Sequence, residues 1–130
     1  MYVQADHDLM NSLERDYEAL YQHATRSRDS RLQRGLSLRL GLLREVRHLM
    51  EHGQNPARVA EVARVILDDV RTMLATRGLK RSAVLLLKRR EFSLEVLLGR
   101  ISDVVANPAG SGSASVAEAQ QAPSIAGVPA

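Results

Sequence analysis

Apolar residues recur every three or four positions along most of the first 106 residues, and this spacing places them on one face of an α-helix. Because three interruptions break the pattern, it predicts four amphipathic helices, over about residues 8–25, 30–52, 56–76 and 80–105. Packing their apolar faces together gives an all-α fold, an antiparallel helical bundle of about four helices over residues 7–106.

The apolar faces of these helices predict which residues form the core. The first helix contributes Met10, Leu13, Tyr17, Leu20 and Ala24. The second contributes Leu32, Leu36, Leu40, Leu43, Val46 and Met50, widened by Leu38, Leu42 and Leu49. The third contributes Val59, Val62, Ala63, Ile66, Val70, Met73 and Leu74. Leu and Val dominate this core and aromatic residues are scarce, which favours helix-on-helix packing.

Turn residues mark the helix boundaries. Gly53 suits the left-handed position after a helix, and Asn55-Pro56 supplies a cap followed by proline in a first helical turn. Near residues 27–30 the apolar phase is lost, which predicts a break with a serine or Asp29 as the next cap. A single bent helix through this region is the alternative interpretation.

The fourth helix has two apolar faces. One holds Leu87, Leu94, Leu98, Ile101 and Val105. A nearly opposite face holds Leu85, Phe92 and Val96. Two faces indicate either a central position in the fold or an interface with another subunit, and self-association is the preferred interpretation. A β-hairpin over residues 82–98 is the competing structure, but no Gly or Asn turn divides the segment.

Composition changes after residue 106. Gly, Ser, Ala, Pro and Gln fill residues 107–130, where Glu118 is the only charged residue. Such a segment has too little apolar surface to offset the entropy of ordering, so a flexible, disordered tail is predicted. The longest apolar run elsewhere, residues 83–87, is too short to span a bilayer, and residues 1–8 lack the order of a secretory signal. A cytoplasmic protein without membrane contact is the expectation.

Catalytic patterns are missing from the sequence. Cysteine is absent and the glycines are isolated, which excludes thiol chemistry and a phosphate-binding glycine loop. His48, Glu51 and His52 spell H-x-x-E-H, the pattern of inverted zinc proteases, but it falls in the last turn of a helix without a strong third ligand. We expect no enzyme activity, no cofactor and no bound metal.

Basic residues gather at two helix junctions. The nine candidate phosphate-binding residues are Arg26, Arg28, Arg31, Arg34, Arg77, Lys80, Arg81, Lys88 and Arg89. In an antiparallel bundle the first and third junctions share one end, so both groups are expected to face one direction. They predict sequence-independent binding to a nucleic-acid backbone. Neutralisation by the acidic first helix and a GC-rich genome are competing explanations of the arginines.

Arg39 and Arg90 interrupt apolar stripes. A buried charge requires a partner, so each is expected to pair with an acid such as Asp16, Glu45 or Asp69, or to extend its charged end to the edge of the core. The alternative is that part of these stripes meets another chain. The sequence thus predicts a non-catalytic accessory subunit that self-associates and binds nucleic acid. The alternative is a protein-binding adaptor or chaperone that uses Leu85, Phe92 and Val96 while the arginines meet an acidic protein partner.

Overall fold

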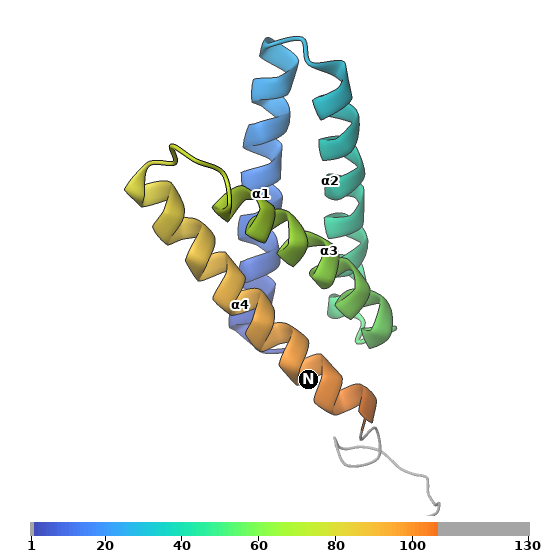
Figure 1. Cartoon of the computed structure of the whole chain (residues 1–130). Helices are drawn as coiled ribbons and strands as arrows, with labels where there is room; N and C mark the ends of the chain where they lie inside the picture. Colours follow the sequence, from blue (N-terminus) through green and yellow to red (C-terminus); the bar gives the residue numbers. More distant parts are fainter. Residues whose placement is uncertain (1, 107–130) are drawn as a thin grey trace, which may run out of the picture.

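The computed structural model describes residues 2–106, which form four helices joined by short turns (Figure 1). They are α1 (Gln4–Arg26), α2 (Ser30–Glu51), α3 (Pro56–Leu74) and α4 (Arg81–Ala106). The all-α prediction is confirmed, with two separate helices at the start of the chain and one continuous helix over residues 82–98. The predicted tail, residues 107–130, lies outside the described residues. Within the described range, no helix is long and apolar enough to cross a membrane.

Side chains cap three of the helices. The Asp29 carboxylate accepts a hydrogen bond from the backbone N–H of Leu32 at 3.0 Å, and the Asn55 side chain accepts one from Arg58 N–H at 3.1 Å. Both satisfy N–H groups that a first helical turn leaves free. The α1 helix begins four residues before its expected start, because the Asp6 carboxylate accepts from the Val3 N–H at 2.9 Å and extends the helix toward the N-terminus.

The helices form two antiparallel hairpins that cross. The α1–α2 pair and the α3–α4 pair each pack along their length, whereas α1 meets α4 over a small area. Figure 1 shows α3 and α4 running obliquely across the α1–α2 hairpin. The bundle therefore has the predicted antiparallel neighbours, and its two hairpins lie at an angle to each other.

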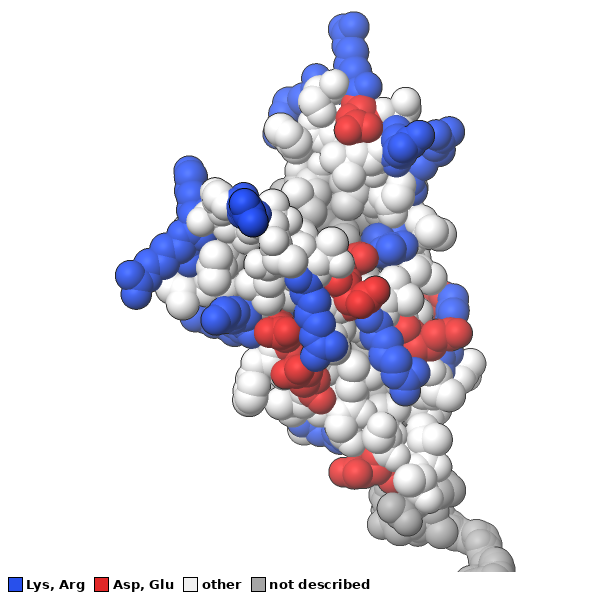
Figure 2. Space-filling view, in the orientation of Figure 1, with Lys and Arg blue, Asp and Glu red and all other residues white. Residues whose placement is uncertain are grey.

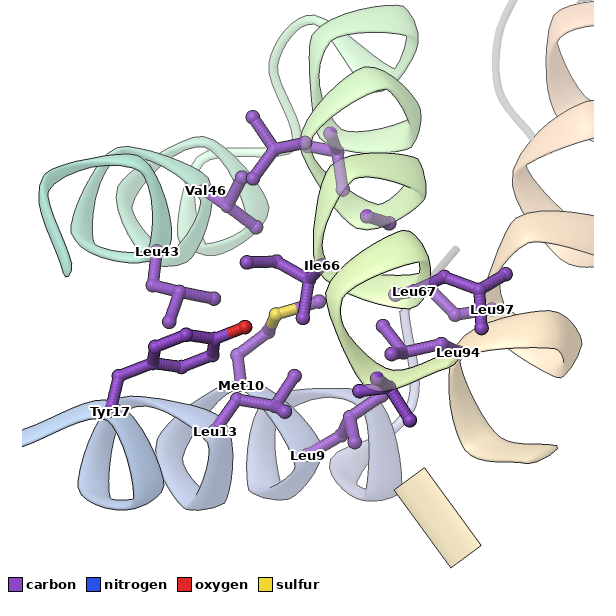
Figure 3. Packing of buried hydrophobic residues seen from close by; sticks show 14 of the residues in the cluster. Leu9, Met10, Leu13, Tyr17, Leu43, Val46, Ile66, Leu67, Leu94 and Leu97 are labelled. Atoms are coloured by element: carbon purple, nitrogen blue, oxygen red, sulfur yellow. The ribbon is translucent and has the colours of Figure 1, made fainter. Parts of the chain in front are cut away.

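The α3 helix fills the centre of the core. Val59, Ala63 and Ile66 are completely buried, and Val62 and Val70 nearly so. Figure 3 shows α1 side chains, among them Met10 and Tyr17, converging with those of α2 and α4 on this helix. Truncating one large side chain here to Ala is expected to cost about 2–5 kcal/mol.

Parts of the predicted stripes are not in the core. Leu20 and Leu32 are 40% and 43% exposed, because the α1–α2 hairpin extends beyond the end of α3 and nothing covers its last turns. Leu38 lies about 200° around α2 from buried Leu36 and faces outward. Val105 is also exposed, although it was expected in the core; it lines an open pocket with Ala57 and Arg64 of α3.

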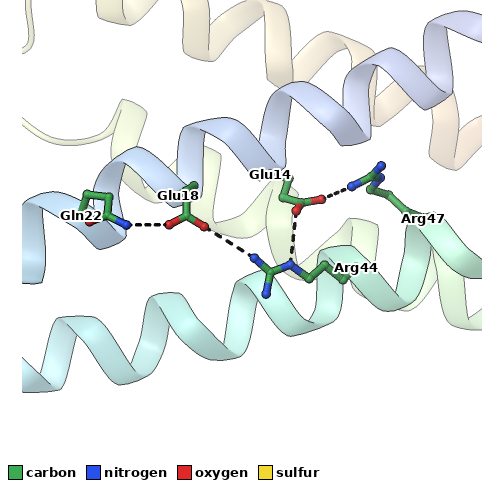
Figure 4. A network of polar contacts seen from close by, with 5 residues as sticks. All are labelled: Glu14, Glu18, Gln22, Arg44 and Arg47. Carbon is green, nitrogen blue, oxygen red and sulfur yellow. Dashed lines mark hydrogen bonds and ion pairs between the residues drawn. The ribbon is translucent and has the colours of Figure 1, made fainter.

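Ion pairs fasten α1 to α2 along their outer side (Figure 4). Glu14 accepts hydrogen bonds from Arg44 Nε at 3.3 Å and from Arg47 Nη1 at 2.5 Å, while Glu18 lies 3.6 Å from Arg44. Desolvation raises the pKa of Glu14, but these two arginines outweigh it, so the net effect is a lowered pKa. The acidic first helix therefore neutralises this part of α2.

We predict that the Glu14→Gln variant loses less stability than the wild type when the pH is lowered. A carboxylate whose pKa is lowered in the folded state stabilises the fold at pH values above its unfolded-state pKa, here 4.5. This contribution to stability is lost as the pH falls through the folded-state pKa. The variant should be about 0.5–1 kcal/mol less stable at pH 7. It should approach the wild type below the folded-state pKa, as urea unfolding at about pH 7 and pH 3 would show.

The control is Asp68→Asn, because Asp68 is an exposed acid of α3 without an ion pair among the described residues. Its unfolding curves should follow the wild type at both pH values. An equal effect of both substitutions would exclude the specific role of the Glu14 pairs.

Candidate functional site

The basic residues of the described chain divide into paired and unpaired sets. Seven arginines form ion pairs with acids: Arg39, Arg44, Arg47, Arg58, Arg71, Arg90 and Arg100. None of the nine predicted phosphate-binding residues has an acidic partner within 4.0 Å in residues 2–106, and all nine are exposed. Elsewhere in residues 2–106, only Arg15 and Arg64 are both exposed and without an acidic partner. Neutralisation within the fold thus does not reach the predicted sites.

Four of the unpaired arginines, Arg26, Arg28, Arg31 and Arg34, form what we call the first tip, at the α1–α2 turn. The turn is closed by other groups: Ser27 Oγ donates to the His23 carbonyl at 3.0 Å, and the Asp29 N–H donates to the Ala24 carbonyl at 3.0 Å. No arginine side chain takes part in these bonds. All four guanidinium groups are therefore left for contacts outside the turn.

Arg28 occupies a strained backbone position. Its φ of 59° lies in the left-handed region, which costs a residue with a Cβ about 1–2 kcal/mol. The other turns within residues 2–106 place glycine or asparagine at such angles, as at Gly53, Gly78 and Asn55. An arginine at this position breaks a local rule of turn chemistry, and such departures cluster where function requires the side chain.

The second tip is the α3–α4 turn with Arg77, Lys80 and Arg81. Gly78 turns the chain with a φ of 80°, and the Lys80 carbonyl accepts from the Val84 N–H at 3.0 Å to start α4. Lys88 and Arg89 follow seven and eight residues after Arg81, about 10 Å farther along the helix. The structure therefore places these two on the exposed side of α4, away from the turn.

The two tips lie on the same half of the molecule but point apart. Figure 1 shows the α1–α2 turn at the top and the α3–α4 turn at the upper left, with the α2–α3 turn at the opposite end. Blue side chains project from both tips in Figure 2, while blue and red alternate between them and the bottom. The expectation that both groups face one direction is corrected to two diverging tips, because the hairpins cross.

A groove with a volume of about 600 Å³ lies between the first tip and the end of α3. Its walls are mostly apolar, with Leu20 of α1, Leu32 and Leu36 of α2, and Met73 of α3. Arg31 of the first tip lies on its rim. The groove is the uncovered end of the α1–α2 stripe, so the same leucines that were expected in the core form its surface.

Asp69 holds the polar side of this groove and joins three helices. Its carboxylate accepts from Arg39 Nε at 2.7 Å and Nη2 at 3.3 Å, and from the Tyr17 hydroxyl at 2.8 Å. Burial, and then the bond to Asp69, raise the pKa of Tyr17, so the phenol stays a donor. The bond to Asp69 likewise raises the pKa of Arg39. The prediction that Arg39 pairs with an acid is confirmed, and of the three candidates the partner is Asp69.

The second predicted pairing is also confirmed. Arg90 Nε lies 3.0 Å from Asp16, which fastens α4 to α1. Both arginines interrupt apolar stripes of their helices and reach an acid of another helix, so neither is left as an unpaired charge near the core.

His48, Glu51 and His52 come together at the end of α2. Their ligand atoms all lie within 4.8 Å of one another, and the two imidazole centroids are 4.4 Å apart. His52 Nδ1 lies 2.9 Å from the His48 carbonyl, which orients its Nε2 away from the backbone. All three side chains are exposed. Among the described residues, this is the one group of three such ligands, and sequence spacing identified it.

Comparisons of the chain with protein-family models, with curated proteins and with solved structures find no match. The site therefore rests on its own geometry. Charge runs in the sequence located both tips, whereas the groove was missed, because its leucines have the same spacing as core residues. Their one distinguishing signal was the arginine that interrupts the stripe, Arg39.

We predict that Asp69→Asn destabilises the fold by about 2 kcal/mol. The substitution removes the charge that Arg39 and the Tyr17 hydroxyl contact, and leaves a half-buried guanidinium without an anion. Thermal and urea unfolding followed by circular dichroism measure the loss. The neighbouring Asp68→Asn is the control, because Asp68 is exposed and its carboxylate makes no ion pair with the described residues. Equal effects of the two substitutions would contradict this role for Asp69.

We also predict that Arg28→Gly stabilises the protein, by about 1 kcal/mol, because glycine adopts the left-handed conformation without a Cβ clash. Arg26→Gly is the matched control. It places the same residue inside the last turn of α1, where glycine costs about 1 kcal/mol relative to alanine. Melting curves of the two variants should shift in opposite directions, and a shift in the same direction would contradict the strain at Arg28.

Proposed function

We propose that this protein is a non-catalytic accessory subunit that binds the phosphate backbone of nucleic acid through its two tips. The single observation that carries the proposal is the division of the basic residues. Arginines elsewhere are mostly neutralised by acids, while every basic residue of both tips is exposed and without an acidic partner in residues 2–106.

Binding is expected to be independent of sequence and sensitive to salt. Neither tip contains Phe, Tyr or Trp, so base stacking has no platform there. Long arginine side chains on two turns suit contacts to phosphates, which release condensed counterions from the polyanion. The strained arginine at position 28 adds support, because glycine would serve the turn better and the side chain must have another use.

The test compares two double variants in a fluorescence-anisotropy titration with a duplex of about 20 base pairs. Arg31→Ala with Arg77→Ala removes one unpaired arginine from each tip. Arg15→Ala with Arg64→Ala removes the same charge from unpaired, exposed arginines outside the tips. The tip variant should bind roughly tenfold more weakly in low salt, and its plot of log affinity against log salt should be shallower by about two units.

The control variant should keep its affinity within about twofold, since its arginines make no phosphate contact. Equal weakening by both variants would mean that net charge alone governs binding. Failure of the wild type to bind the duplex at low salt would overturn the proposal.

The groove favours a second candidate, an adaptor that binds an acidic amphipathic helix of another protein. Its apolar walls and the adjacent arginines fit such a helix, which places an apolar face in a hydrophobic groove. Leu32→Gln separates the two functions, because Leu32 is half-exposed in the groove and a phosphate backbone has no use for it. Duplex binding should withstand this substitution, whereas capture of an acidic helical peptide should be lost.

A further inference from the structure

The α4 helix has one buried face and one exposed apolar face. Leu94, Leu97 and Ile101 are completely buried against the rest of the fold. On the opposite side Phe92, the only phenylalanine of the chain, is 68% exposed, and the adjacent Leu85 and Val96 are 57% and 42% exposed. A single isolated leucine on a surface is ordinary, but three apolar side chains in a row on one helix face indicate a contact surface.

Charges on this exposed face are arranged around Phe92 in order. The residues of the face, all exposed, are Arg81, Leu85, Lys88, Arg89, Phe92, Glu95, Val96, Gly99 and Asp103. The basic members all precede Phe92, and the acidic members all follow it. A face with this order is complementary to a second copy of itself that runs in the opposite direction.

We propose that this face binds a second copy of the chain, as an antiparallel α4–α4 pair with a two-fold axis at Phe92. Positions equally far before and after Phe92 then lie at the same height along the pair. Lys88 of one copy lies beside Glu95 of the other, because both are on the same side of the contact line, and Arg81 lies near Asp103. The contact is isologous, with the same surface used by both subunits, as in most symmetric dimers.

Two further features fit this register. Leu85 lies opposite Gly99, and a Cβ at Gly99 would meet no atom within 4 Å, so the open backbone there leaves room for the leucine side chain. Glu95 Oε2 accepts from Arg71 at 2.6 Å, while its second oxygen has no hydrogen bond among the described residues. That oxygen is available to Lys88 of the second copy.

A parallel pairing is disfavoured by the same charges. It would place Lys88 against Lys88 and Glu95 against Glu95, and like charges in contact repel. The antiparallel pair also sets the positive end of each helix dipole beside the negative end of the other. Direction and register are therefore both specified by three exposed residues of α4, Lys88, Phe92 and Glu95.

The contact does not depend on the proposed binding of nucleic acid. It assigns Lys88 and Arg89, which stand apart from the α3–α4 turn, to self-association. Arg81 belongs to both surfaces and is left out of both tests. A single pair of helix faces is smaller than a standard protein interface, so the dimer is expected to be weak, with a dissociation constant in the micromolar range.

Because the chain has no cysteine, single introduced cysteines report the register cleanly. Phe92→Cys places two thiols face to face at the axis, so mild oxidation should produce a covalent dimer. Leu85→Cys places its thiols about 21 Å apart in the dimer, too far for a disulfide, so it should not cross-link with itself. A mixture of Leu85→Cys and Gly99→Cys should cross-link as a heterodimer.

Sedimentation of the full chain at about 200 µM supplies the second measurement, chosen to lie above the expected dissociation constant. The wild type should be dimeric and Phe92→Asp monomeric, with an unchanged melting curve because Phe92 makes no core contact. Lys88→Glu should weaken the dimer, and adding Glu95→Lys in the same chain should restore it.

Three results would overturn the proposal: a monomeric wild type at this concentration, self-cross-linking of Leu85→Cys as fast as that of Phe92→Cys, or no restoration by the double charge exchange. Duplex affinity of Phe92→Asp, measured at protein concentrations that leave the wild type monomeric, should equal the wild-type value. Failure of self-association and failure of nucleic-acid binding are thereby distinguished.

Discussion

Burial of α3 against the other three helices is the interaction on which the rest of the structure depends. Its Val and Ala side chains are small enough to let α1 and α2 approach on one side and α4 on the other, and its central residues are almost entirely removed from water. Close packing of this kind makes each contact sensitive to a change of one methylene. The angle at which α3 crosses the α1–α2 hairpin follows from how these side chains interdigitate. That angle and the length of α3 decide which parts of the longer helices remain uncovered.

The uncovered parts are where the candidate functions gather. The α1–α2 hairpin outruns α3, which leaves Leu20 and Leu32 as groove walls and carries the first tip away from the core. On α4, one face meets the core and the opposite one is left bare. The groove, the basic tips and the bare face thus follow from one arrangement, two hairpins that cross at an angle around a short central helix, α3.

The helices could be predicted because their ends depend on neighbouring residues. Contacts between residues far apart in the sequence could not be predicted in the same way. Asp29, Gly53 and Asn55-Pro56 act on neighbouring residues, so their effect on helix ends is legible in sequence. The partners of Arg39 and Arg90 lie 30 and 74 residues away, and several acids satisfied the requirement equally well until the fold placed Asp69 and Asp16 opposite them. The crossing angle is a property of the assembled surface, so sequence spacing predicted Leu20, Leu32 and Val105 as core. The basic tips were found because charge runs need no long-range information, but their lack of acidic partners depends on the whole fold.

The separation of paired from unpaired charge gives the protein a lopsided electrostatic field. Most of the body is locally neutral because its arginines are paired with acids. The excess positive charge therefore lies mainly on side chains that project from two turns in one half of the molecule. A polyanion approaching through solution exerts a torque on such a distribution and rotates the protein before contact, which raises the fraction of collisions that begin in a productive orientation. The rate of encounter would then be set by where the arginines sit rather than by how many there are.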